Sequence, residues 1–264
     1  MPIERIHAHQ VTEGSCPPPA LIDSYFFPEV SAGGFSRNDS AVAFYQRINA
    51  LVSSSSVLID FGAGCGASHY VSYRSRLRNF KGRVSKVVGL DVDPAVIANP
   101  SLDEAFLLDP DGRAPLPAGT ADIIFSDYVF EHFRDPTQSV AEIDRLLKPG
   151  GWICARTPNR FGYIAVANRL IPDQMSKLVL RILQPWRKSE HVFPAFYRLN
   201  TPGTLRKFFP PSRFEHFVYA WDADPLYHAN SRILYRAFLA LNYLTPPPLK
   251  PFLMIFIRKK SGAG

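Results

Sequence analysis

A glycine-rich turn directly after a short apolar run is the feature of the sequence that most clearly points to chemistry. The run spans residues 57–61 and the turn spans residues 62–66. Glycines at such a turn permit positive φ angles and let the backbone approach a ligand closely. If the run is a strand of a parallel sheet, the turn lies at the carboxyl edge, where such folds bind ligands. The pattern predicts a nucleotide-type cofactor. The positions concerned are Asp60, Gly62, Ala63, Gly64 and Gly66.

A second acidic residue, Asp91, ends the next apolar run and could accept hydrogen bonds from both hydroxyls of a ribose. With Ala67, the glycines also fit the G-x-G-x-x-G/A dinucleotide fingerprint, which is weak evidence on its own. Asp91 lies 29 residues after Gly62, beyond the ~20 expected at a dinucleotide site. A carboxylate at Asp60 also suits a cationic ligand better than a pyrophosphate. Both observations argue against a dinucleotide, and an NAD-dependent oxidoreductase is kept as the alternative function.

The elements that must position these residues are a series of short apolar runs. Five of them lie at 57–61, 87–91, 106–109, 123–126 and 152–155. Runs without polar alternation fit strands that are covered on both faces, as in a parallel sheet. Their spacing leaves room for crossover helices. Two further strands are expected near 214–221 and 251–258.

One crossover helix is well marked in the sequence. Asp135 is suited to the N-cap and Pro136 to the first helical position. Apolar residues then recur at helical spacing, and the segment 148–151 is expected to end the helix and turn into the fifth strand. The apolar positions are Val140, Ile143, Leu146 and Leu147. Other helices are expected near 40–52, 175–188, 201–209 and 231–244.

Four motifs share their order and spacing with a known family. They are VLIDFGAGCG at 57–66, VVGLDVDP at 87–94, APLPAGTADIIFSDYVFEHFRDP at 114–136 and AEIDRLLKPGGWICARTPNR at 141–160. They resemble the class I S-adenosylmethionine-dependent methyltransferases, type-11/UbiG-like branch. The resemblance covers residues 38–160 well and 190–260 in outline. It implies an α/β fold with a doubly wound, seven-stranded, mostly parallel sheet, which is the Rossmann-like methyltransferase fold with an antiparallel C-terminal edge strand.

The resemblance also implies an organisation and a site. A single domain would span 38–264 after an N-terminal arm at 1–37, with 157–200 as a helical lid over the acceptor. Asp60 and the 62–66 turn would hold the methionine end of S-adenosylmethionine. The adenosine would be held by Asp91 at the ribose, Val92 against adenine, Asp109 at the adenine amino group (Asp111 is the alternative), and Ser126 and Asp127 along the cofactor.

His132 is the best candidate for a general base, against a structural role in the loop, and no metal ligand set is evident. The expected reaction transfers a methyl group to an oxygen of a small-molecule, saccharide or lipid-linked acceptor. Because the sulfonium already activates the methyl group, positioning and sometimes removal of one proton suffice. A non-catalytic, membrane-associated protein that binds the cofactor is a further alternative.

Charge is divided unevenly along the chain. Residues 1–150 hold 13 basic and 18 acidic residues, whereas residues 151–264 hold 17 basic and 5 acidic ones. The basic part predicts an anionic acceptor, or peripheral contact with an anionic membrane through 175–188. No nucleic-acid-binding module is legible. Three scattered cysteines and the lack of an apolar N-terminal segment favour a cytoplasmic protein that can lie on the inner face of a membrane.

Overall fold

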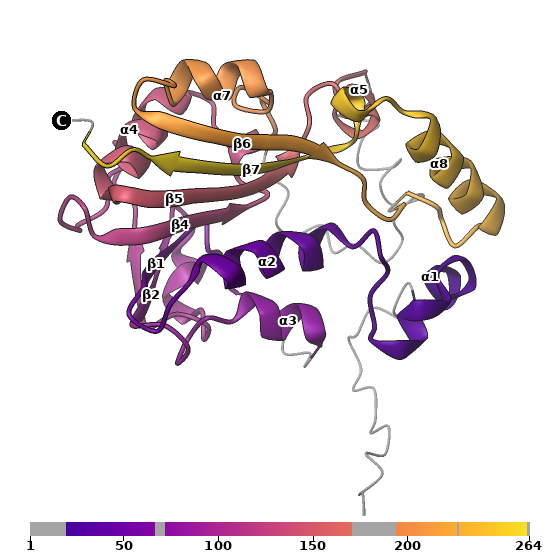
Figure 1. Cartoon of the computed structure of the whole chain (residues 1–264), viewed down its shortest axis with the longest axis horizontal. Helices are drawn as coiled ribbons and strands as arrows, with labels where there is room; N and C mark the ends of the chain where they lie inside the picture. The colour runs from indigo at the N-terminus through magenta and orange to yellow at the C-terminus, as the bar shows by residue number, and fades with distance from the viewer. Residues whose placement is uncertain (1–19, 67–71, 171–193, 226, 263–264) are drawn as a thin grey trace, which may run out of the picture.

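A computed structural model describes residues 20–66, 72–170, 194–225 and 227–262. A single sheet with helices on both faces dominates it (Figure 1). Its strands are β1 (Val57–Phe61), β2 (Lys86–Asp91), β3 (Glu104–Leu107), β4 (Ala121–Asp127), β5 (Leu147–Pro158), β6 (Phe214–Trp221) and β7 (Phe252–Lys259). The α-helices are α1 (Ala20–Phe26), α2 (Ser40–Leu51), α3 (Tyr73–Arg78), α4 (Pro136–Leu146), α5 (Tyr163–Leu170), α7 (Pro202–Phe208) and α8 (Arg232–Leu244). Short 3-10 turns are η1 (Pro28–Ala32), η2 (Pro94–Ala98), η3 (Phe130–His132) and η4 (Pro247–Leu249).

The strand order is β3-β2-β1-β4-β5-β7-β6. The first five strands pair in parallel, and β7 pairs antiparallel with both β5 and β6. Since β1 lies between β2 and β4, the order reverses there, and such a switch point opens a crevice at the carboxyl ends of the strands. The doubly wound, mostly parallel sheet with an antiparallel C-terminal edge is confirmed.

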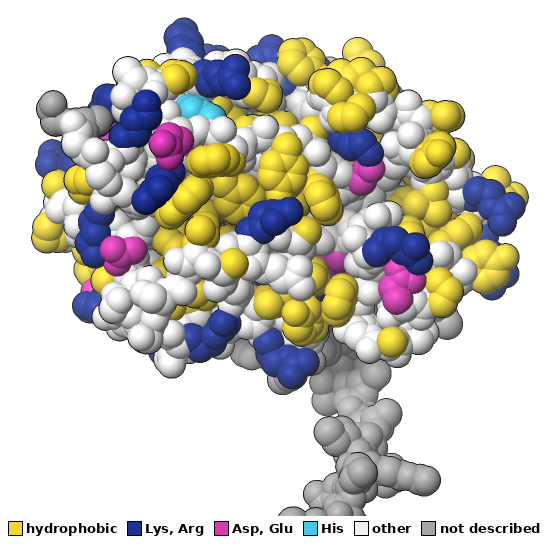
Figure 2. Space-filling view, viewed as in Figure 1, with side chains coloured by type: hydrophobic (Ala, Val, Ile, Leu, Met, Phe, Trp, Pro, Cys, Tyr) yellow, Lys and Arg dark blue, Asp and Glu magenta, His cyan; other side chains and the backbone are white. Residues whose placement is uncertain are grey.

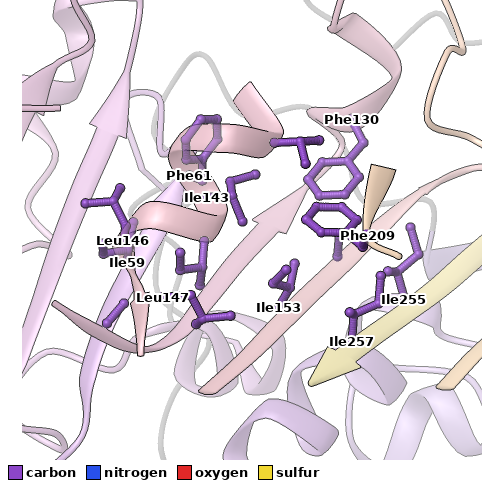
Figure 3. Close-up of a cluster of buried hydrophobic side chains, with 14 of the residues drawn as sticks. Ile59, Phe61, Phe130, Ile143, Leu146, Leu147, Ile153, Phe209, Ile255 and Ile257 are labelled. Atoms are coloured by element: carbon purple, nitrogen blue, oxygen red, sulfur yellow. The ribbon is translucent and has the colours of Figure 1, made fainter. Parts of the chain in front are cut away.

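Apolar side chains cover both faces of the sheet, as the uninterrupted apolar runs predict. In β1, Leu58 belongs to the cluster beneath α2, whereas Ile59 and Phe61 belong to the cluster beneath α4. Figure 3 shows the second cluster, with Ile143 and Leu146 of α4 packed over the strands. Because both clusters share the strands, the sheet and its carboxyl edge form a rigid base for a site.

Local capping chemistry fixes the starts of the helices. Asp39 accepts hydrogen bonds from the backbone N–H groups of Ala41 and Val42, and Asp135 accepts one from Thr137. These side chains satisfy backbone donors that have no partner inside the helix. The helices predicted near 40–52, 136–147, 201–209 and 231–244 are confirmed as α2, α4, α7 and α8.

Two predicted element bounds are wrong. The third strand spans 104–107, not 106–109, because Val88 of β2 already pairs with Glu104. Residues 147–151 belong to β5 rather than to the end of a helix and a turn. Ala121 pairs with Leu147, and a register shift before Ile123 absorbs the extra residues.

Residues 20–32, which we assigned to the arm, hold α1 and η1. Ile22 and Phe27 pack with Tyr235 of α8, and the Tyr235 hydroxyl donates to Asp23 at 2.8 Å. The helix expected at 175–188 lies outside the described residues, as does most of the expected lid. In the part of the chain that is described, no helix combines the length and the apolar character needed to cross a membrane.

Candidate functional site

The glycine turn after β1 has the backbone geometry that its sequence predicts. Gly62, Gly64 and Gly66 have φ angles of 84°, 52° and 86°. A Cβ atom at Gly62 would lie 2.3 Å from Val129, and one at Gly66 would lie 2.4 Å from Asn99. At Gly64 it would meet nothing within 4 Å. Two of the glycines are therefore needed for packing, while Gly64 faces open space where a ligand could approach.

Asp91 at the end of β2 joins this turn to the neighbouring strand. One carboxylate oxygen accepts from the Gly64 N–H at 2.8 Å, and the other accepts from the Asp93 N–H at 2.9 Å. The turn is also anchored by the Gly62 N–H, which donates to the Leu90 carbonyl at 2.7 Å. Val92 follows with 68% of its surface exposed. The structure thus brings together the turn and Asp91, and leaves an apolar side chain open beside them.

The Asp60 carboxyl lies in β1 just before the turn. Burial raises its pKa to about 7, and the nearby carboxylates of Asp127 and Asp91 add to this, while Arg78 opposes it. A carboxylate in such surroundings is stabilised by a cation placed beside it. Asp60 therefore fits a positively charged group of a ligand.

The side chains of Ser126 and Asp127 at the end of β4 are engaged inside the protein. Arg156 of β5 donates from Nε and Nη2 to the two Asp127 oxygens, both at 2.8 Å, and the Tyr45 hydroxyl adds a third bond at 3.1 Å. Ser126 donates to the Phe61 carbonyl at 2.9 Å. Both residues lie at the expected edge of the sheet, where they tie β4 to its neighbours.

Asp109 lies beyond β3 in a turn that closes on itself. Its carboxylate accepts from the Arg113 N–H at 2.8 Å, and its carbonyl accepts from the Gly112 N–H at 2.8 Å. The neighbouring Asp111 is exposed. The Leu108 N–H just before this turn donates to the Asp91 carbonyl at 2.9 Å, so Asp109 lies at the same edge of the sheet as Asp91, although its carboxylate bonds within its own turn.

His132 lies in η3, after β4, beside a buried polar network. Its Nδ1 is 2.9 Å from the carbonyl oxygen of Pro194, and its Nε2 is 4.0 Å from Glu131. A carbonyl only accepts, so Nδ1 carries the proton in this bond, and the lone pair of the neutral ring belongs to Nε2. This is the tautomer in which Nε2 can take up a proton.

Glu131 connects this loop to the end of β5. It accepts from the Thr157 hydroxyl at 2.7 Å, and Thr157 in turn accepts from the Asn200 amide at 2.7 Å. Burial raises the pKa of Glu131 to about 7. The network joins residues from three distant segments and holds the loop that carries His132 against the sheet.

Sequence reasoning missed Arg156, Thr157 and Asn200. For Arg156 a usable pattern existed, because a basic residue directly after the fifth apolar run stands beside Asp127 in the β4–β5 register. Tyr128 was also unforeseen as a strained position: its φ angle is 60°, and such backbone strain concentrates at functional sites. The Arg156 guanidinium lies 4.8 Å from the centre of the Tyr128 ring.

Comparison with known proteins shows which proteins the candidate site resembles. Residues 61–155 match a family model described as "Methyltransferase domain". A protein of Mycolicibacterium smegmatis named "Probable S-adenosylmethionine-dependent methyltransferase" is 32% identical over 108 residues, which cover 38% of each chain. Over these residues the present chain is similar to S-adenosylmethionine-dependent methyltransferases. The narrower assignment to the UbiG-like branch stays a prediction.

Two further similarities show how much of the chain resembles known methyltransferases. An uncharacterized methyltransferase of Schizosaccharomyces pombe is 36% identical over 44 residues, 17% of this chain and 16% of its own. The matches to both curated relatives thus span well under two thirds of the relatives' length. A solved S-adenosylmethionine-dependent methyltransferase of Archaeoglobus fulgidus aligns over 90% of this chain and all of its own, with a TM-score of 0.51 at 17% identity. That likeness supports the fold.

The Mycolicibacterium smegmatis relative is named as S-adenosylmethionine-dependent, and the residues present in this chain fit that cofactor. The open space at Gly64 admits a ligand against the backbone. The carboxylate of Asp60 matches a cationic group, and Asp91 matches ribose hydroxyls at the neighbouring strand end. When bound, S-adenosylmethionine supplies a methyl group on a positively charged sulfur.

Proposed function

We propose that this methyltransferase transfers the methyl group of S-adenosylmethionine to an oxygen of a small-molecule, saccharide or lipid-linked acceptor. The observation that carries the proposal is the half-buried Asp60 carboxyl, with a pKa raised to about 7, next to a glycine turn that is open at Gly64. This combination favours a cationic cofactor over a pyrophosphate, and so disfavours the NAD-dependent alternative.

The roles of the binding residues follow from their places. Asp60 would hold the ammonium group, Gly64 would let the methionine end lie against the backbone, and Asp91 would accept the ribose hydroxyls. Val92 is open to adenine. Ser126 and Asp127 would act through their backbone and by fixing β4, because their side chains already have partners.

The proposed chemical step is an in-line displacement. The acceptor oxygen forms the new C–O bond while the bond between the methyl carbon and sulfur breaks, and the electron pair stays on sulfur to give S-adenosylhomocysteine. The hydroxyl proton passes to Nε2 of His132. Glu131, when ionised, stabilises the imidazolium from 4.0 Å, and general-base help of this kind contributes about 10²–10⁴-fold.

The acceptor class is proposed from charge. Residues 151–264 carry 17 basic and 5 acidic residues. This positive charge favours an anionic acceptor such as a phosphorylated saccharide or lipid. Peripheral membrane contact through 175–188 is part of the same proposal.

The test is to incubate the protein with radiolabelled S-adenosylmethionine and a fractionated cell extract. We expect label in a saccharide or lipid fraction and about 10²-fold or greater loss of turnover in His132→Gln with cofactor affinity retained. The matched control is His216→Gln, whose imidazole bonds the Phe209 carbonyl away from this loop. Label confined to protein or RNA would overturn the acceptor class, and full turnover in His132→Gln would remove the base.

A further inference from the structure

Helix α8 is apolar on two opposite faces. Its inner face packs through Tyr235 and Asn242, which are buried. Its outer face has an apolar stripe at the spacing of one helix side, made of Ile233, Ala237, Ala240, Leu241 and Leu244. Ile233, Leu241 and Leu244 are 82%, 41% and 76% exposed. An ordinary surface helix turns polar residues outward, so this stripe needs a partner outside the described fold.

Basic residues flank the stripe. Arg232 and Arg236 are exposed on α8, and their guanidinium groups lie 4.4 and 5.9 Å from the ring centres of Tyr25 and Phe26 in α1. Tyr243, 89% exposed, lies on the same side of the helix as the two arginines. From residue 225 to residue 264 the sequence contains no Asp or Glu. Figure 2 shows hydrophobic and basic side chains together over α8.

The charge decides which occupant fits. A twofold pairing of two copies through α8 would bring two basic patches together, and residues 225–264 contain no Asp or Glu to neutralise them. An anionic lipid surface instead attracts each Lys or Arg held close to it and accepts the apolar stripe among its acyl chains. A basic and apolar helix face lying parallel to the surface is the arrangement of interfacial helices.

The stripe is tied to the acceptor end of the molecule. In Figure 1, α8, α1 and α5 lie beyond the carboxyl ends of β4 and β5. The Asn159 amide directly after β5 donates to the carbonyls of Pro248 and Lys250, both at 2.9 Å, in the connection that follows α8. The rings of Tyr163 in α5 and Phe238 in α8 are 5.7 Å apart. A surface that holds α8 therefore lies near the edge of the sheet that carries the candidate site.

We propose that α8 is a membrane-docking helix that lays the stripe Ile233–Leu244 on an anionic phospholipid surface. The docked protein would present the carboxyl edge of its sheet to the lipid surface. This deepens the proposed function, on which it rests, by favouring a lipid-linked acceptor among the proposed classes.

The test is flotation of the full chain with phosphatidylcholine vesicles that contain phosphatidylglycerol, and with vesicles of phosphatidylcholine alone. We expect binding to the anionic vesicles that weakens as salt rises. The variant Ile233→Ser/Leu244→Ser should lose at least about tenfold in partitioning, since two large apolar side chains leave the lipid. Arg232→Gln/Arg236→Gln should lose roughly thirtyfold at low salt.

Matched controls separate α8 from general effects. Phe217→Ser removes a side chain that is 52% exposed on β6, and Arg206→Gln/Lys207→Gln removes two exposed charges from α7. Both should bind vesicles like the unmodified protein. Equal loss in the controls, no vesicle binding by the unmodified protein, or a dimer that Ile233→Ser/Leu244→Ser abolishes would overturn the docking proposal. Titration with S-adenosylmethionine tests the proposed function separately, because every α8 variant should keep its cofactor affinity.

Discussion

The two sides of the candidate site are built in different ways. The proposed cofactor side consists of two short runs of consecutive residues, the turn 62–66 and the end of β2, which hydrogen-bond one another. The proposed acceptor side joins Glu131, Thr157 and Asn200, which are brought together only by the fold. A cofactor site made of local backbone geometry is legible in a sequence, whereas a site made of long-range side-chain contacts is not.

The pair Asp127–Arg156 links the two sides. Asp127 ends β4 in the acidic part of the chain, and Arg156 lies near the end of β5 in the basic part. The side chains of both residues are less than a tenth exposed. A further bond runs from the guanidinium to Ser40 at the start of α2, at 2.7 Å. If the pair is lost, we expect both sides of the candidate site to lose their structure together.

The largest effect is expected from Arg156→Met. The change leaves the Asp127 carboxylate buried without its charged partner, which costs about 3–5 kcal/mol of the free energy of unfolding. Urea denaturation measures this. The double variant Asp127→Asn/Arg156→Met should recover part of the loss, because the uncompensated charge is gone. If the free energy of unfolding of Arg156→Met lies within about 1 kcal/mol of that of the unmodified protein, the pair does not hold the two sides together.

The next largest effect is expected from Asp60, which belongs to the proposed cofactor side alone. The pKa of Asp60 is raised to about 7 in the folded protein, so the folded state keeps this proton to higher pH than the unfolded state. Stability therefore falls as pH rises from about 4 to about 7. Asp60→Asn removes this loss, and above pH 7 it should be more stable than the unmodified protein by about 1–3 kcal/mol.

Thermal or urea unfolding of the two proteins at pH 5 and pH 8 measures this difference. Glu131 also has a raised pKa of about 7, but it is present in both proteins and cancels in the comparison. A stability difference that does not grow between the two pH values would contradict the raised pKa of the Asp60 carboxyl.

The smallest effect separates backbone strain from cofactor contact. Gly64 and Gly119 both have positive φ angles, 52° and 64°, and neither has an atom within 4 Å of an added Cβ. Alanine at either position should cost about 1 kcal/mol of stability. Only Gly64→Ala should also weaken binding of S-adenosylmethionine, by about tenfold or more in calorimetric titration, and an equal loss in Gly119→Ala would contradict the open face at Gly64.

Local patterns account for the parts of the fold that were predicted. Asp135 and Pro136 mark the start of α4 within the sequence itself, and β6 spans the predicted residues, an aromatic-rich run that lies between Pro211 and Asp222. The bounds of β3 depend on its register against β2, and α1 is held by Tyr235 more than two hundred residues away. Neither relation leaves a local pattern.

The candidate site divides along the same line. The Gly62–Gly66 turn and Asp91 carry a motif because backbone geometry and spacing constrain the residue types. The Arg156 partner of Asp127 follows from the β4–β5 register, and the Thr157 partner of Glu131 follows from the fold of the loop after β4. The residues that determine acceptor specificity therefore have to be identified by experiments on the folded protein.

Direct titration of the full chain with S-adenosylmethionine and with NADH, followed by calorimetry, tests the central claim. The proposed cofactor side predicts that S-adenosylmethionine binds and that S-adenosylhomocysteine competes with it. Asp91→Ala should abolish the binding of both compounds, and NADH should produce no binding heat. Binding of NADH without binding of S-adenosylmethionine would contradict the assignment.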